Sequence, residues 1–135
     1  MSIIIKKDGY VFDVDIEKTK NYYKSHSLCE CDYCKNFYEQ IKGKFPKLEA
    51  FLSDLGIDIS KPDEISPLES GDIIEYLSVD YTVCGKIATM AEHKIHIEDD
   101  ILFSLRITDG YSSPNEQTAD YFTISVHNLE LPKRR

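Results

Sequence analysis

The spacing of the hydrophobic positions changes along the first part of the chain. Two β-rich runs, Ile3–Ile5 and Tyr10–Phe12, flank a Lys-Asp-Gly turn signal, which predicts an N-terminal hairpin over residues 2–14. Asp15 is a typical helix N-cap, and it predicts a short helix that ends near Lys24. We expect the chain to remain mainly helical through the segment 15–56.

One apolar stripe runs through the second part of this helical segment. Its members recur mostly at steps of three or four residues and are Cys34, Phe37, Tyr38, Ile41, Phe45, Leu48, Leu52 and Leu55. Gly43 and Pro46 interrupt the stripe, because the residue before a proline avoids the α region. The pattern predicts two helices, 33–43 and 46–55, or one helix with a sharp kink. Asp32 is the expected N-cap and Gly56 the expected stop signal.

The remainder of the chain alternates apolar and polar positions with period two. We expect 57–71 to be an acidic loop with at most one helical turn, and 72–128 to form antiparallel strands that each bury one face. Turns are expected at 98–100 and 109–117. The inward positions are predicted to be Ile73, Leu77, Val79, Tyr81, Val83, Ile87, Ile95, Ile97, Ile101, Phe103, Leu105, Ile107, Phe122, Ile124 and Val126. The predicted fold class is α+β, with an antiparallel sheet of four to six strands and two or three helices packed on one face.

Composition limits the possible partners. The 135 residues are 41% hydrophobic and 30% charged, which is enough for one domain, 1–135, with a real core. The longest pure apolar run is Ile3–Ile5, so we expect a cytoplasmic protein without a membrane span or signal sequence. The net charge of −8 argues against nucleic acid and anionic membranes.

The acidic residues are concentrated in the segment 54–80, where Lys61 is the only base. This acidic segment contains Asp54, Asp58, Asp63, Glu64, Glu69, Asp72, Glu75 and Asp80. It is either a docking face for a basic protein partner or a solvated loop.

Three of the four cysteines fall within six residues, and three interpretations of the cluster stay open. His26, Cys29, Cys31 and Cys34 could bind zinc, with Cys84 as a substitute for His26. Alternatively, Cys31 and Cys34 form a C-x-x-C redox pair, in which the first helical turn favours the thiolate of Cys34. In the third interpretation, the cysteines pack as small hydrophobic residues. Cys84 itself is expected to be a buried structural thiol under a helix.

Polar residues on the predicted strands form a second candidate constellation. They are His96, Arg106, Tyr121, Thr123, Ser125 and His127. On neighbouring strands they could hold an anionic ligand, and the alternative is a solvated sheet face. The chain contains no Gly-rich phosphate loop, nucleophile elbow or H-E-x-x-H motif, so no enzyme class and no catalytic residue is supported.

Five segments resemble a small family of uncharacterised bacterial cytosolic proteins that share a C-x-C-x-x-C segment followed by Lys or Arg, Asn and Phe. The segments are 9–15, 29–38, 45–48, 61–65 and 81–86. The resemblance implies a bacterial cytosolic setting and carries over no catalytic residue. We expect a non-catalytic binding or interaction domain. The alternative is a small thiol-redox or metal-dependent enzyme that uses the cysteine cluster.

Overall fold

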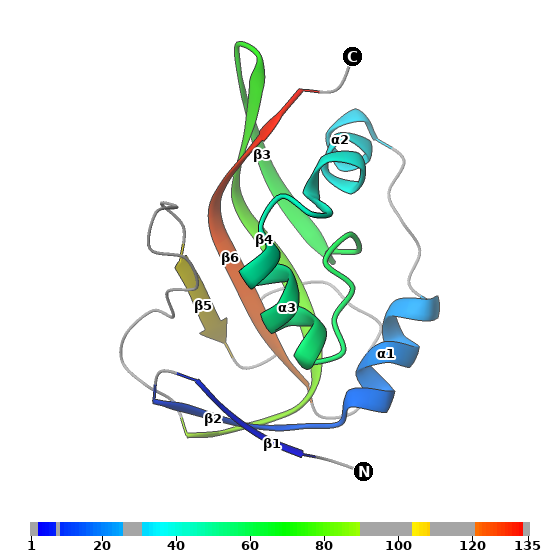
Figure 1. Ribbon diagram of the computed structural model, residues 1–135, viewed down its shortest axis with the longest axis vertical. Helices are drawn as coiled ribbons and strands as arrows, with labels where there is room; N and C mark the ends of the chain where they lie inside the picture. The colour runs from blue at the N-terminus through cyan, green and yellow to red at the C-terminus, as the bar shows by residue number, and fades with distance from the viewer. Residues whose placement is uncertain (1–2, 8, 26–30, 90–103, 109–120, 134–135) are drawn as a thin grey trace.

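The computed structural model describes residues 3–7, 9–25, 31–89, 104–108 and 121–133, with the backbone alone at 104–108 and 128 (Figure 1). This part of the chain contains three helices and six strands, which confirms the α+β class. The elements are β1 (Ile3–Lys7), β2 (Tyr10–Val14), α1 (Ile16–Ser25), α2 (Asp32–Ile41), α3 (Pro46–Asp54), β3 (Glu64–Ser70), β4 (Ile73–Thr89), β5 (Ser104–Thr108) and β6 (Tyr121–Pro132).

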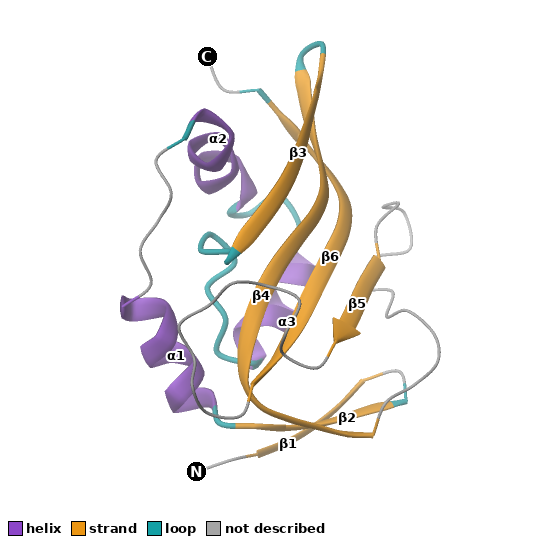
Figure 2. Ribbon diagram, turned by 180° about the vertical axis from the view of Figure 1, so that it is seen from behind, coloured by secondary structure: helices purple, strands orange, loops and turns teal. Residues whose placement is uncertain are grey.

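The strands form one antiparallel sheet built around β4. The order is β1-β2-β4-β6-β5, and β3 pairs with β4 as well. One edge of β4 pairs with β3 and then with β2, while its other edge pairs with β6 from Ile73 to Cys84. Helices α2 and α3 cover one face of the sheet (Figure 1), and the view from behind shows the strands in front of them (Figure 2). The helical layer is therefore on one side of the sheet.

Local signals place the helices close to the expected positions. The Asp15 carboxylate accepts a hydrogen bond from the Lys18 amide at 3.0 Å, which caps α1 and lowers the pKa of Asp15. Pro46 begins α3, so the stripe splits into two helices. Gly56 ends α3 with a φ of 89°, and the Ile57 amide donates to the Leu52 carbonyl at 3.0 Å.

The alternation along β4 changes phase once, which corrects the predicted inward face. Ser66 of β3 pairs with Ser78, and the next residue, Pro67, pairs with Tyr76. Leu77 is the extra residue of this bulge, and it is 42% exposed. Ile74 and Tyr76 are buried before the bulge, whereas Val79, Tyr81 and Val83 are buried after it. The prediction that Ile73 and Leu77 share the face of Val79 was therefore wrong.

The acidic loop predicted over 57–71 contains a strand. Glu64–Ser70 forms β3, although its proline and its acidic residues are of types that are rare in strands. Among the described residues β3 pairs with β4 alone, so it is an edge strand, where a proline without an amide hydrogen is tolerated. Pairing with β4 thus overrides the local composition. The strand positions expected at 95–103 and the turns at 98–100 and 109–117 lie outside the described residues.

Tyrosine hydroxyls attach the helical layer and its loops to the sheet. Tyr23 of α1 donates to the Thr82 carbonyl at 2.7 Å, and Tyr81 of β4 donates to the Ile59 carbonyl at 2.6 Å. Tyr76 donates to the Tyr33 carbonyl at 2.8 Å. These hydroxyls keep their hydrogen bonds in a core that is otherwise apolar. That core is made of Tyr10, Phe12, Val14, Tyr22, Tyr23, Phe37, Ile41, Phe45, Leu48, Phe51, Leu52, Leu55, Ile57, Ile59, Ile74, Tyr76, Val79, Tyr81, Val83, Cys84, Phe122, Ile124, Val126, Leu129 and Leu131.

Thr19 joins α1 to β4, and its replacement gives a first prediction. The side chain is fully buried, and its hydroxyl donates to the Asp15 carbonyl at 2.9 Å and accepts from the Cys84 amide at 3.0 Å. We expect Thr19→Val to lower the free energy of unfolding by about 2 kcal/mol, because the buried Cys84 amide loses its acceptor. Urea denaturation measures the loss. Amide exchange at Cys84 should accelerate in Thr19→Val and stay slow in the control Thr19→Ser; equal exchange in both variants contradicts the prediction.

Candidate functional site

Cys31 and Cys34 lie at the first turn of α2. Cys31 is exposed and is the N-cap, and its sulfur accepts a hydrogen bond from the Cys34 amide at 3.4 Å. Cys34 is half-buried. Two expectations are corrected here. Asp32 is the first helical residue and not the N-cap. The amide hydrogen bond of the first turn goes to the sulfur of Cys31, whereas the sequence predicted that this turn would favour the thiolate of Cys34. A sulfur atom fills the N-cap position because that site requires an acceptor.

The predicted zinc ligands are only partly within the described residues. His26 and Cys29 lie outside them, and within the described ranges no group of three His, Cys, Asp or Glu side chains is placed to hold a metal. Tyr76, whose hydroxyl contacts the first turn of α2, is eight residues from Cys84 along β4. That is about 26 Å of extended strand. Cys84 thus stands apart from Cys31 and Cys34.

Cys84 is a buried thiol beneath a helix, as expected. Its amide donates to Thr19 of α1, and burial raises the pKa of the Cys84 thiol. Since the nucleophile in thiol chemistry is the thiolate, this site is suited to packing and not to reaction.

The polar strand residues divide into two groups. Thr123 and Ser125 are buried, so the expectation of a solvated face is wrong for these two. The Ser125 hydroxyl donates to the Asp80 carboxylate at 2.6 Å. Tyr121 and His127 are half-buried, and His96 lies outside the described residues. Arg106 is described through its backbone, which pairs with Ser125.

Several carboxylates of the acidic segment are bound within the protein. Asp63 accepts hydrogen bonds from the hydroxyls of Tyr22, at 2.5 Å, and of Thr82. Glu69 forms an ion pair with Lys133 at 2.8 Å. These contacts use acidic side chains that an open docking face would need. The exposed members of the segment are Asp54, Glu64, Glu69 and Asp72.

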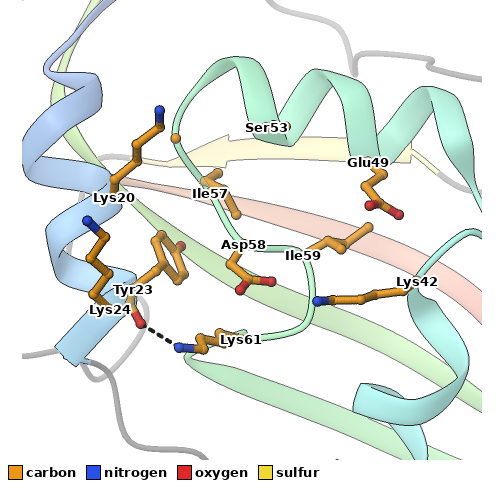
Figure 3. A pocket seen from close by; sticks show the side chains of 11 residues that line it. Lys20, Tyr23, Lys24, Lys42, Glu49, Ser53, Ile57, Asp58, Ile59 and Lys61 are labelled. Carbon is orange, nitrogen blue, oxygen red and sulfur yellow. Dashed lines mark hydrogen bonds between the residues drawn. The ribbon is translucent and has the colours of Figure 1, made fainter.

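A cavity of about 350 Å³ lies between α1, α3 and the segment 56–61, and Figure 3 shows it from close by. Its size falls at the lower end of the range typical of small-ligand sites. Sequence analysis did not single it out. The side chains and backbone that line it belong to Lys20, Tyr23, Lys24, Lys42, Glu49, Ser53, Gly56, Ile57, Asp58, Ile59 and Lys61.

The rim of this pocket carries excess positive charge. Its four lysines outnumber its two carboxylates, in a chain whose net charge is −8. Among the described residues none of the four ammonium groups lies within 4 Å of a carboxylate. The Lys61 ammonium donates to the Tyr23 carbonyl at 2.9 Å, which holds it beside the last turn of α1. The pocket therefore attracts anions locally although the protein as a whole repels them.

The two carboxylates of the pocket are bound to neighbouring groups. Glu49 accepts from the Gly43 amide at 3.0 Å. Asp58 accepts from the amide of Ser60 at 3.0 Å and from its hydroxyl at 2.7 Å. Both carboxylates thus have hydrogen-bond donors other than the lysines, and the ammonium groups keep their capacity to bind a ligand.

The floor of the pocket is apolar. Tyr23, Ile57 and Ile59 are buried, and in Figure 3 the two isoleucines flank the Asp58 carboxylate in the middle of the pocket. One part of the site had a signal in the sequence: Lys20 and Lys24 are four residues apart, which places them on one helix face. Lys42 and Lys61 come from distant segments, so only the fold brings them to the same cavity.

Comparisons with protein-family models, with curated proteins and with solved structures gave no match. The fold and the site by themselves define the class of protein: an α+β protein with an antiparallel sheet and a lysine-rimmed pocket. In the part of the chain that is described, no helix is long and apolar enough to span a membrane.

Proposed function

We propose that this protein is a non-catalytic binding domain whose pocket takes an anionic ligand. The observation that carries the proposal is the set of four lysines, without carboxylate partners among the described residues, around an apolar-floored cavity. A concave site with a mostly apolar floor and a few placed charges is the common form of a ligand site. We also propose a protein partner and a bacterial cytosolic setting. The resemblance of the 29–38 segment supports the setting.

The pocket is tested by reversing one of its charges. Citrate, titrated calorimetrically at low salt, is the probe of a multivalent anion. We expect Lys24→Glu to weaken citrate binding roughly tenfold or more, because one attraction is lost and one repulsion is added, each worth about 1 kcal/mol in water. The matched control is Lys35→Glu, an exposed lysine of α2 that does not line the pocket. Equal weakening in both variants, or a wild type that binds neither citrate nor an acidic peptide, contradicts the proposal.

A second candidate function is thiol–disulfide exchange, favoured by the position of Cys31 as the N-cap of α2. The partial positive charge of the helix N-terminus favours an exposed thiolate there. The thiolate would attack a substrate disulfide and release one thiolate. Cys34 would then attack the Cys31 sulfur, release the second thiol and leave a Cys31–Cys34 disulfide. Two electrons pass to the substrate, and a small-molecule thiol restores the reduced pair.

Native thiol counting tests this candidate together with the zinc site. We expect Cys31 to be alkylated rapidly in metal-free folded protein and Cys84 to resist until unfolding, because Cys31 is exposed and Cys84 is buried. Metal content is measured on the same sample. About one zinc per chain with protected thiols would instead support ligation by His26, Cys29, Cys31 and Cys34. A metal-free protein whose Cys31 does not react excludes the redox candidate.

A further inference from the structure

The charges of the lysine-rimmed pocket are dispersed and not focused on one point. In Figure 3, Lys20, Lys24 and Lys61 lie toward one end and Lys42 reaches in from the other, and between them lie Ile57, Asp58 and Ile59. Lys20 and Lys24 are exposed on α1, and Lys42 is exposed after the end of α2. A ligand that meets these ammonium groups together must carry its negative charges on separate groups.

The pocket lacks the features of a compact phosphate site. Such sites use helix N-termini, backbone amide nests or arginine forks. Here α1 contributes Lys20, Tyr23 and Lys24, and α3 contributes Ser53 near its C-terminal end and the carboxylate of Glu49. Helix C-termini carry partial negative charge, which opposes one concentrated anion. The described lining contains lysines and no arginine, and a lysine acts as a separate point charge.

The floor adds a requirement for an apolar group. Ile57 and Ile59 line the cavity at its centre, and Tyr23 lies beside them. A cavity of about 350 Å³ has room for one large apolar side chain with its flanking backbone. The site thus combines a central apolar surface with cations on either side, and the central carboxylate, Asp58, is hydrogen-bonded to Ser60.

We infer that the ligand is an acidic peptide segment that carries one apolar side chain between its carboxylates. The apolar side chain packs against Ile57 and Ile59, and the flanking carboxylates meet Lys20, Lys24 and Lys42. Carboxylates spaced along a peptide match dispersed lysines better than a single phosphate does. This inference rests on the proposed function, because it names the partner of the same pocket.

Capped pentapeptides test the inference. The first has four glutamates around a central leucine, the second replaces the leucine with serine, and the third replaces the glutamates with glutamines. We expect the leucine peptide to bind roughly tenfold more tightly than the serine peptide and than citrate, because it buries a leucine side chain. The glutamine peptide should not bind measurably. Lys24→Glu should weaken the leucine peptide roughly tenfold, and Lys35→Glu should leave its affinity unchanged.

Methyl resonances give a readout that does not depend on a variant's stability. The methyl groups of Ile57 and Ile59 should shift with the leucine peptide and shift less with the serine peptide. If Lys24→Glu weakens citrate binding, and both acidic peptides bind no more tightly than citrate, the ligand is a small anion. In that case the inference fails and the proposed function stands. If neither peptides nor citrate bind, both fail. If a peptide binds without shifting the Ile57 methyl resonances, and with the same affinity in Lys24→Glu as in the wild type, its site is elsewhere on the protein. This outcome also overturns the inference.

Discussion

Gly85→Ala is expected to destabilise the fold by about 4 kcal/mol, which for a domain of this size removes most of the stability. Gly85 lies in β4 where β2 joins it, paired with Val14. Its φ is 148°, and a Cβ added there would lie 2.1 Å from the Asp13 carbonyl oxygen. Because that neighbour is backbone, the β2–β4 pairing must separate to admit even a methyl group. Urea denaturation and near-ultraviolet circular dichroism measure the loss.

Gly71→Ala is the matched control for this prediction. Gly71 also has a positive φ, 63°, but nothing lies within 4 Å of the Cβ it would gain. The cost should be that of the left-handed conformation alone, about 1 kcal/mol. A Gly85→Ala protein as stable as Gly71→Ala would show that β2 does not approach β4 this closely.

The second large effect is a loss of stability at alkaline pH. Burial raises the pKa of Tyr23 and of Tyr81 well above the usual range, and the nearby acidic groups raise both further. Burial also raises the pKa of Tyr76. In the unfolded chain these phenols ionise near pH 10, whereas the folded protein keeps them neutral. The unfolded state therefore binds fewer protons above pH 10, so stability is complete below that pH and falls as pH rises toward the folded pKa values.

The loss of stability is measured as the urea unfolding midpoint at a series of pH values from 8 to 11.5. Tyrosinate absorbance on the same samples measures the ionisation of the phenols. Tyr81→Phe is the informative variant. It loses the hydrogen bond to the Ile59 carbonyl and starts from lower stability, but its stability should fall less steeply above pH 10. The same slope in the wild type and in Tyr81→Phe would show that this hydroxyl plays no part in the alkaline transition.

Elements with local signals were predictable from the sequence. The Asp-Gly turn, the Asp15 cap, Pro46 and Gly56 act through neighbouring residues, and the hairpin and helices appear where these signals place them. The strand β3 and the bulge at Leu77 depend on pairing with β4, so composition and period alone misplace them. A bulge inserts one residue and reverses every later side chain on that strand.

In the candidate site, too, features with local signals were predictable and features that depend on distant segments were not. The sequence predicts that Cys31 and Cys34 lie at the start of a helix. It does not predict that the Cys31 sulfur is the N-cap acceptor in place of Asp32. The lysine-rimmed pocket was missed because Lys42 and Lys61 are far from α1 in sequence. Besides the spacing of Lys20 and Lys24, a hint was Lys61, the only base of the acidic segment, and its bond to the Tyr23 carbonyl explains its position.

The central position of β4 has a consequence for synthesis on the ribosome. The hairpin β1–β2 emerges before the other described elements, yet its partner residues in β4 lie at 85–89, and the long partner of β4 is β6, which ends at Pro132. Until β6 has left the exit tunnel, one edge of β4 stays open and the apolar faces of α2 and α3 remain uncovered. Topologies with such distant pairings fold slowly and expose surfaces that aggregate. We therefore expect the nascent chain to bind chaperones that hold unfolded polypeptides until β6 has emerged.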